Sequence, residues 1–74
     1  MSIQRETRIP MRSLKAMARN LECTIRRVYG TDEFRVNWIG ASESVAYYTN
    51  SDLDALRTME EMKRGLDNAR SHMV

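Results

Sequence analysis

The chain has 74 residues, 42% of them hydrophobic and 30% charged, and this length leaves room for one small two-layer core. Its single cysteine, Cys23, excludes an internal disulfide and is expected to be a small core residue in a reducing compartment. No run of about twenty apolar residues is present that would cross a membrane, and the first residues lack the apolar segment of a signal peptide. These features predict a cytoplasmic protein with no membrane partner.

The charge is small in total but unevenly distributed. The net charge of the whole chain is +2. Residues 1–29 carry seven basic and two acidic side chains, a net charge of +5, whereas residues 30–74 carry five basic and eight acidic ones, a net charge of −3. Such an asymmetry indicates a charged partner without identifying it.

A first helix is predicted to begin at Pro10, because proline is tolerated in the first turn of a helix. The apolar residues that follow recur at intervals of three and four, as one face of a helix requires; they are Met11, Leu14, Met17, Ala18 and Leu21. The opposite flank of this helix carries Arg12, Lys15 and Arg19.

After this helix the hydrophobic period changes to alternation, which is typical of β-strands. The clearest strand has Phe34, Val36 and Trp38 on one face. A less regular strand precedes it at residues 23–28, and a third follows at residues 44–49. The turn-rich segments between them are short enough to join antiparallel neighbours.

Residues 51–73 are predicted to form a second amphipathic helix. Its apolar stripe recurs at spacings of four and three and consists of Ala55, Met59, Met62, Leu66, Ala69 and Met73. Ser51 and Asp54 fit a capping box, and Asp52 adds negative charge where the helix dipole is positive. The start of this helix is therefore well marked.

Because each helix and the sheet have one apolar face, both helices should cover the same side of the sheet. The sequence predicts an α+β fold, a two-layer α-β-β-β-α arrangement in which a three-stranded antiparallel meander has both helices on one face. Residues 1–9 are predicted to be a flexible basic N-terminal arm, and residues 10–74 a single domain. The predicted shared core consists of Leu14, Met17, Phe34, Val36, Trp38, Val45, Tyr47, Leu56, Met59 and Met62.

The other sheet face is predicted to be open, and it carries the candidate binding residues. Its side chains are Arg26, Arg35, Asn37, Ile39, Ala46 and Tyr48. Cations beside an aromatic ring can bind phosphates, stack on bases or grip an acidic protein surface, although antiparallel sheets also commonly turn a polar face to water. The complete predicted binding set is Arg12, Lys15, Arg19, Arg26, Arg35, Asn37 and Tyr48. An alternative contact to a basic partner uses Asp54, Glu60, Glu61 and Asp67.

No pattern in the chain predicts catalysis, a metal or a cofactor. His72 is the only histidine and has no second type of metal ligand clustered with it. The three glycines are far apart, so they form no phosphate-binding loop, and the serines lack a nucleophile-elbow context. A non-enzymatic binding protein is the expectation. The small core and the long apolar stripe also predict a homodimer or other small oligomer, joined through the far end of the last helix or an edge strand.

Residues 46–56, with the sequence AYYTNSDLDAL, lead from a tyrosine-rich strand through an acidic cap into the last helix. This stretch resembles small accessory proteins of bacteriophages and other mobile elements, a group that includes anti-CRISPR proteins and other inhibitors of bacterial defence. The resemblance covers the last third of the chain and implies a protein that blocks a site on a host protein or ribonucleoprotein complex, in the cytoplasm of a bacterial host. It assigns no site residue, because that group shares no common active site.

Two other functions stay open at this point. One is a small nucleic-acid-binding module that uses the basic half of the chain, for which steep salt dependence is expected. The other is an oligomeric sponge that sequesters a nucleotide signal in a pocket.

Overall fold

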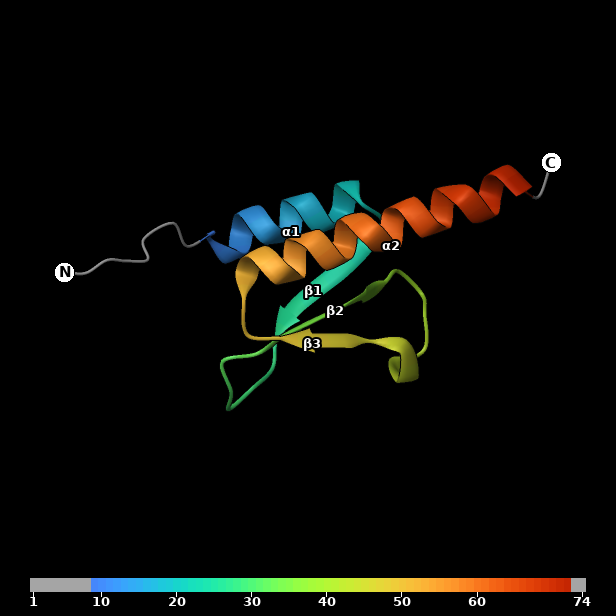
Figure 1. The fold of residues 1–74 in the computed structure, drawn as a ribbon. Coiled ribbons are helices and arrows are strands. Elements are labelled where there is room, and N and C mark those ends of the chain that lie inside the picture. Colours follow the sequence, from blue (N-terminus) through green and yellow to red (C-terminus); the bar gives the residue numbers. More distant parts are fainter. Residues whose placement is uncertain (1–8, 73–74) are drawn as a thin grey trace.

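The computed structural model describes residues 9–72, without the side chain of His72. Its elements follow the predicted order, helix, three strands, helix (Figure 1). They are α1 (Met11–Asn20), β1 (Cys23–Arg27), β2 (Phe34–Trp38), the 3-10 helix η1 (Glu43–Val45), β3 (Tyr47–Thr49) and α2 (Asp52–His72). The predicted end of the last helix at Met73 lies outside the described residues.

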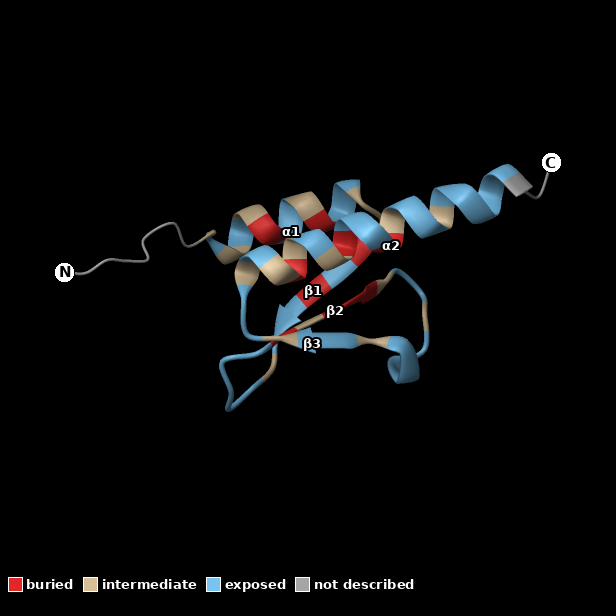
Figure 2. Cartoon of the chain, in the orientation of Figure 1, coloured by how far each residue is buried: buried red, intermediate tan, exposed pale blue. Residues whose placement is uncertain are grey.

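The strands form one antiparallel sheet in the order β1-β2-β3, with Ile25 opposite Val36 and Val36 opposite Tyr47. Both helices lie on the same side of this sheet, α1 over β1 and α2 over β2 and β3 (Figure 1). The predicted two-layer α+β fold is therefore confirmed. The C-terminal half of α2 extends beyond the sheet and is mostly exposed (Figure 2).

Helix α1 starts as the sequence predicts and ends in a conformation that the sequence did not reveal. The carbonyl oxygen of Pro10 accepts hydrogen bonds from the N–H groups of Ser13 and Leu14, both at 3.0 Å. After the helix, Glu22 adopts a φ of 59°, a left-handed conformation that costs a non-glycine residue about 1–3 kcal/mol. Its carbonyl oxygen accepts the N–H of Ile39 at 3.1 Å, so the residue that reverses the chain also begins the pairing of β1 with β2.

Only half of the predicted capping box forms at the start of α2, because the Ser51 N–H donates to the Thr49 hydroxyl rather than to Asp54. The Ser51 hydroxyl accepts the Asp54 N–H at 3.1 Å, while the Asp54 carboxylate accepts the Tyr47 hydroxyl at 2.8 Å. Asp52 accepts the backbone N–H of Ile9 at 2.7 Å, and Ile9 packs against the core. Ile9, predicted as the last residue of a flexible arm, thus belongs to the folded unit; the rest of that predicted arm, residues 1–8, lies outside the described residues.

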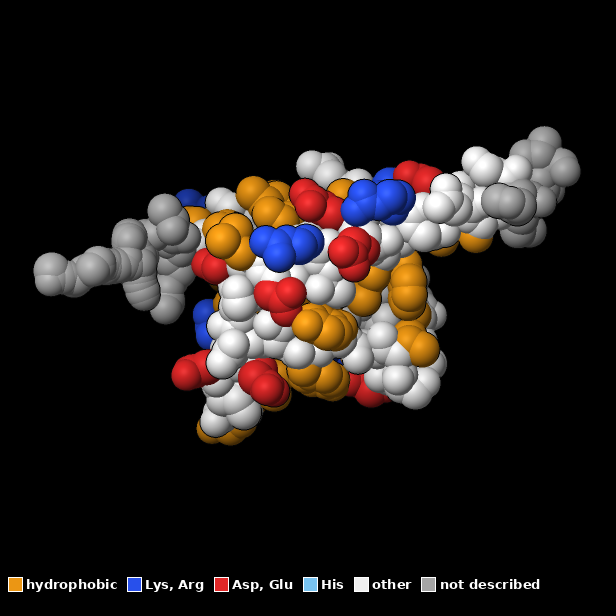
Figure 3. All heavy atoms as spheres, viewed as in Figure 1, with side chains coloured by type: hydrophobic (Ala, Val, Ile, Leu, Met, Phe, Trp, Pro, Cys, Tyr) orange, Lys and Arg blue, Asp and Glu red, His pale blue; other side chains and the backbone are white. Residues whose placement is uncertain are grey.

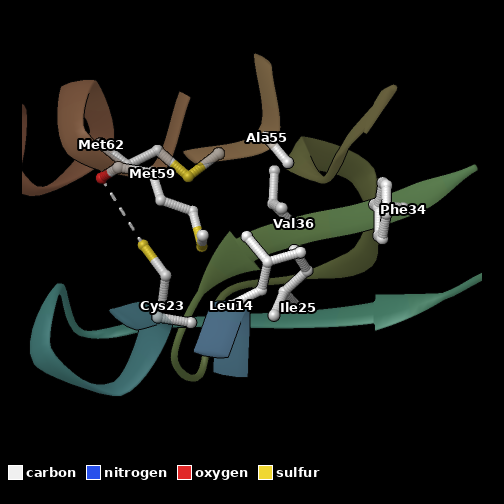
Figure 4. Packing of buried hydrophobic residues seen from close by; sticks show 9 residues of the cluster. Leu14, Cys23, Ile25, Phe34, Val36, Ala55, Met59 and Met62 are labelled. Atoms are coloured by element: carbon white, nitrogen blue, oxygen red, sulfur yellow. Dashed lines mark hydrogen bonds between the residues drawn. The ribbon is translucent and has the colours of Figure 1, made fainter. Parts of the chain in front are cut away.

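One hydrophobic core fills the space between the layers (Figures 2 and 4). Its buried members are Leu14, Ala18, Cys23, Ile25, Phe34, Val36, Ala55, Met59 and Met62. Cys23 is a small core residue as predicted; its thiol contacts the carbonyl oxygens of Leu21 and Met59 at 3.4 and 3.9 Å. Burial raises the pKa of this thiol above its ordinary value.

Two residues of the predicted core, Val45 and Tyr47, are exposed instead, so this part of the prediction is wrong. Val45 is 48% exposed because residues 43–45 form η1 rather than the start of a strand. Tyr47 is 41% exposed, since β3 has only three residues at the edge of the sheet and the ring reaches Asp54 instead of the interior. Trp38 and Leu56 lie at the margin of the core, and Met17 is half-buried.

Candidate protein-interaction surface

The structure brings three predicted binding residues into one row across the sheet. Arg26 of β1 pairs with Arg35 of β2, which pairs with Tyr48 of β3. In strands, successive side chains alternate between faces, and the neighbours Ile25, Val36 and Tyr47 lie on the helix side, so this row lies on the outer face. The predicted grouping of these residues is therefore correct.

A carboxylate outside the predicted binding set lies against this row. The Glu43 carboxylate in η1 accepts hydrogen bonds from Nε and Nη2 of Arg35, both at 2.7 Å. It also accepts a hydrogen bond from the Tyr48 hydroxyl at 2.7 Å. The Arg35 hydrogen bonds, with a smaller contribution from Tyr48, lower the pKa of Glu43 from 4.5 to about 2. The bond to Glu43 in turn raises the pKa of Tyr48. Arg35 and Tyr48 are thus already engaged within the chain. Arg26 forms no ion pair within residues 9–72, although its charge also helps to lower the pKa of Glu43.

The outer face is also less open than predicted. Asn37 is only 1% exposed although it belongs to this face. Its Nδ2 atom donates to the Ser42 carbonyl oxygen at 3.0 Å, and its Oδ1 atom accepts the Trp38 N–H at 2.8 Å. The β2–β3 connection therefore folds over this part of the sheet, and the prediction that Asn37 is displayed on an open face is wrong. Ile39 lies just beyond β2 and is 60% exposed, while Ala46 is half-buried.

No local pattern in the sequence revealed this cover. The sequence placed the third strand at residues 44–49, whereas the structure leaves residues 39–46 between the two strands, a longer connection than predicted. Its acidic residue, Glu43, follows the Arg35 position by eight residues.

The basic residues of α1 border the free edge of β1. Arg12, Lys15 and Arg19 follow one another at intervals of three and four, so they share one side of the helix, and all are exposed. Lys15 and Arg19 line a shallow open hollow of about 170 Å³ together with Ala18 and with the β1 residues Cys23, Thr24 and Ile25. We call Arg12, Lys15, Arg19 and Arg26 the basic edge. Within residues 9–72, none of these four cations lies within ion-pairing distance of a carboxylate.

Glu22, the one acidic residue among residues 9–29, forms its ion pairs with α2. Its carboxylate accepts a hydrogen bond from Nζ of Lys63 at 3.0 Å and forms an ion pair with Arg70. The bonds from Arg70 and Lys63 lower the pKa of Glu22 from 4.5 to about 2. Arg27 is separated from the basic edge in another way, because its guanidinium stacks over the Phe34 ring at 4.7 Å. Among residues 9–72, neither Glu22 nor Arg27 therefore takes part in the basic edge, which keeps a net positive charge.

The opposite side of the molecule has a different character. In Figure 3 acidic and basic side chains alternate over α2, and hydrophobic side chains gather below it, over β3 and its surroundings. The large exposed apolar side chains of this region are Ile39, Val45, Tyr47 and Tyr48. The predicted acidic alternative, with Asp54, Glu60, Glu61 and Asp67 on α2, is interrupted by cations: Lys63 pairs with Asp67 at 3.0 Å.

Residues 9–72 contain no group of three His, Cys, Asp or Glu side chains placed to hold a metal ion. Neither described helix is long and apolar enough to span a membrane. Comparison with protein-family models, with curated proteins and with solved structures gave no match.

Proposed function

We propose that this chain is a non-enzymatic binding protein that occupies an acidic site on a larger host protein or ribonucleoprotein complex. The observation that carries the proposal is the basic edge, where four exposed cations that form no ion pair within residues 9–72 stand beside an open sheet edge. Exposed charges arranged in this way increase the rate of encounter with a partner of opposite charge and fix its orientation.

An acidic protein surface is favoured over nucleic acid because of Glu43. The arginine and tyrosine that would bind a phosphate and stack on a base are both bonded to that carboxylate. The hollow beside β1 is shallow and open, whereas small-molecule sites enclose most of their ligand, so a nucleotide sponge is also disfavoured.

The kind of inhibitor is proposed from the resemblance of residues 46–56 to phage and mobile-element accessory proteins. On that basis the partner is a component of a bacterial defence system, as for an anti-CRISPR protein, and the place of action is the cytoplasm of the host. A protein that only covers a surface needs no catalytic group, metal or cofactor.

The test is affinity capture from a bacterial lysate with two charge-matched variants. Lys15→Glu with Arg19→Glu changes the basic edge, and Arg57→Glu with Arg64→Glu makes the same change of charge on α2. All four side chains are exposed or border solvent, so both variants should keep their thermal stability within about 0.5 kcal/mol per substitution. We expect the wild type and the α2 variant to retain one protein partner, and the basic-edge variant to lose it.

The captured protein is then purified, and its direct binding is measured as salt rises, with and without nuclease. Binding that weakens with salt and survives nuclease supports the proposal. Loss on nuclease treatment, equal loss with the two variants, or loss only after Glu60→Lys with Glu61→Lys would refute it and favour a nucleic-acid partner or the acidic face of α2.

A further inference from the structure

The free edge of β1 carries unpaired backbone groups. The hydrogen bonds from Ile39 to Glu22 and from Val28 to Glu33 mark two hydrogen-bonded positions of the β1–β2 ladder. Such positions alternate along an antiparallel pair, so the N–H and C=O groups of Cys23, Ile25 and Arg27 point away from β2. In the described part of the chain, no other element forms a backbone hydrogen bond with these groups.

The cations of α1 stand above this edge at a suitable spacing. Lys15 and Arg19 line the hollow whose floor includes Cys23 and Ile25. Residues four apart on a helix lie about 6 Å from each other, and alternate residues of a strand lie about 6.6 Å apart on one face. A strand placed along β1 would therefore bring two alternate side chains against Lys15 and Arg19. Carboxylates at those two positions would meet both cations.

From this geometry we propose that β1 accepts an extended acidic segment of the partner protein as a fourth strand of the sheet. The proposal rests on the proposed function and specifies how the partner is held. Backbone hydrogen bonds to Cys23, Ile25 and Arg27 supply the attachment, and the two cations of α1 select carboxylates at alternate positions. On the outer face of the sheet, the same segment lies beside Arg26, which favours further acidic residues.

A second copy of this chain is a poor occupant of the edge. Pairing β1 with itself would bring Lys15, Arg19 and Arg26 of one copy against the same residues of the other, and like charges in register are destabilising. The other free edge, β3, has only three residues and offers a shorter ladder. The sequence suggested a dimer joined through the far end of the last helix or through an edge strand. Charge therefore disfavours a dimer that pairs through the β1 edge.

The experiment uses the full chain and a ten-residue capped peptide with Glu at alternate positions and Thr between them. Two modified peptides carry N-methyl groups, one on every Glu and the other on every Thr. Successive N–H groups of a strand point to opposite sides, so only one modified peptide has its hydrogen bonds to β1 blocked. We expect that peptide to lose binding and the other to keep it. Loss with N-methyl-Glu indicates an antiparallel added strand, and loss with N-methyl-Thr a parallel one.

Two further readouts separate strand addition from charge attraction alone. Binding of the unmodified peptide should slow hydrogen exchange at the amides of Cys23, Ile25 and Arg27, while the Tyr48 amide on the outer edge of β3 stays unchanged. Lys15→Glu with Arg19→Glu should weaken binding of the Glu peptide about tenfold or more. The same variant should bind more tightly a matched peptide that has Lys in place of every Glu. The α2 variant, Arg57→Glu with Arg64→Glu, should bind the Glu peptide like the wild type.

Equal effects of the two N-methyl patterns, or no protection at the three edge amides, would overturn strand addition. If the captured partner is still lost with the basic-edge variant in that case, the proposed function stands and the partner docks through side chains only. If the capture also ignores the basic edge, both proposals fail.

Discussion

The core between the layers predicts a large difference between two leucine truncations. Leu14 of α1 is fully buried and lies next to Ile25 and Val36 (Figure 4), whereas Leu53, in the first turn of α2, is 52% exposed. Leu14→Ala removes three buried carbon atoms, a loss of about 2.4 kcal/mol at about 0.8 kcal/mol each. The cavity left behind raises the total loss of unfolding free energy to about 3–4 kcal/mol. Leucine and alanine are both good helix formers, so helix propensity contributes little.

Urea denaturation followed by circular dichroism measures this loss. For a domain of this size each kcal/mol lowers the Tm by about 4–8 °C, so Leu14→Ala should lower it by at least about 12 °C. Leu53→Ala removes the same atoms from a half-exposed site with no cavity, and should cost about 1 kcal/mol or less. Equal losses for the two variants would refute the packing of α1 against the sheet.

Three further predictions concern single residues. No atom lies within 4 Å of the position of a Cβ on Gly65, in an exposed turn of α2, so Gly65→Ala should stabilise the protein by about 1 kcal/mol; a lower Tm would contradict this. The pKa of Glu22 is about 2, below its ordinary 4.5, so its ion pairs stabilise the fold above pH 4.5 and lose this effect as the pH falls toward 2. The Tm difference between wild type and Glu22→Gln, which keeps the same backbone, should therefore shrink over that range, and a constant difference would be inconsistent with it. Cys23 is 2% exposed and the pKa of its thiol is raised, so a thiol reagent should react with it much more slowly in the native protein than in urea; equal rates would argue against its burial.

The amino-acid sequence determined the elements of this protein and their arrangement in two layers. The helical spacing of Leu14 and Ala18, the alternation through Phe34 and Val36, and the cap at Ser51 are local signals. Each depends on residues a few positions apart, which is the range over which helix and strand periodicity act. The single apolar face of each element then leaves one way to bury all of them, with both helices on one side of the sheet.

Only the tertiary structure decided which of the predicted binding residues are free. Arg35 and Tyr48 are held by Glu43, and Asn37 is buried, because the β2–β3 connection returns over the sheet. Glu22, which follows α1, is paired with Lys63, 41 residues away, because α2 packs against α1. The path of a connection and the meeting of charges from distant segments depend on the packed whole, so no local pattern specifies them. The free cations of α1 and the open edge of β1 became a candidate site only when the fold placed them side by side.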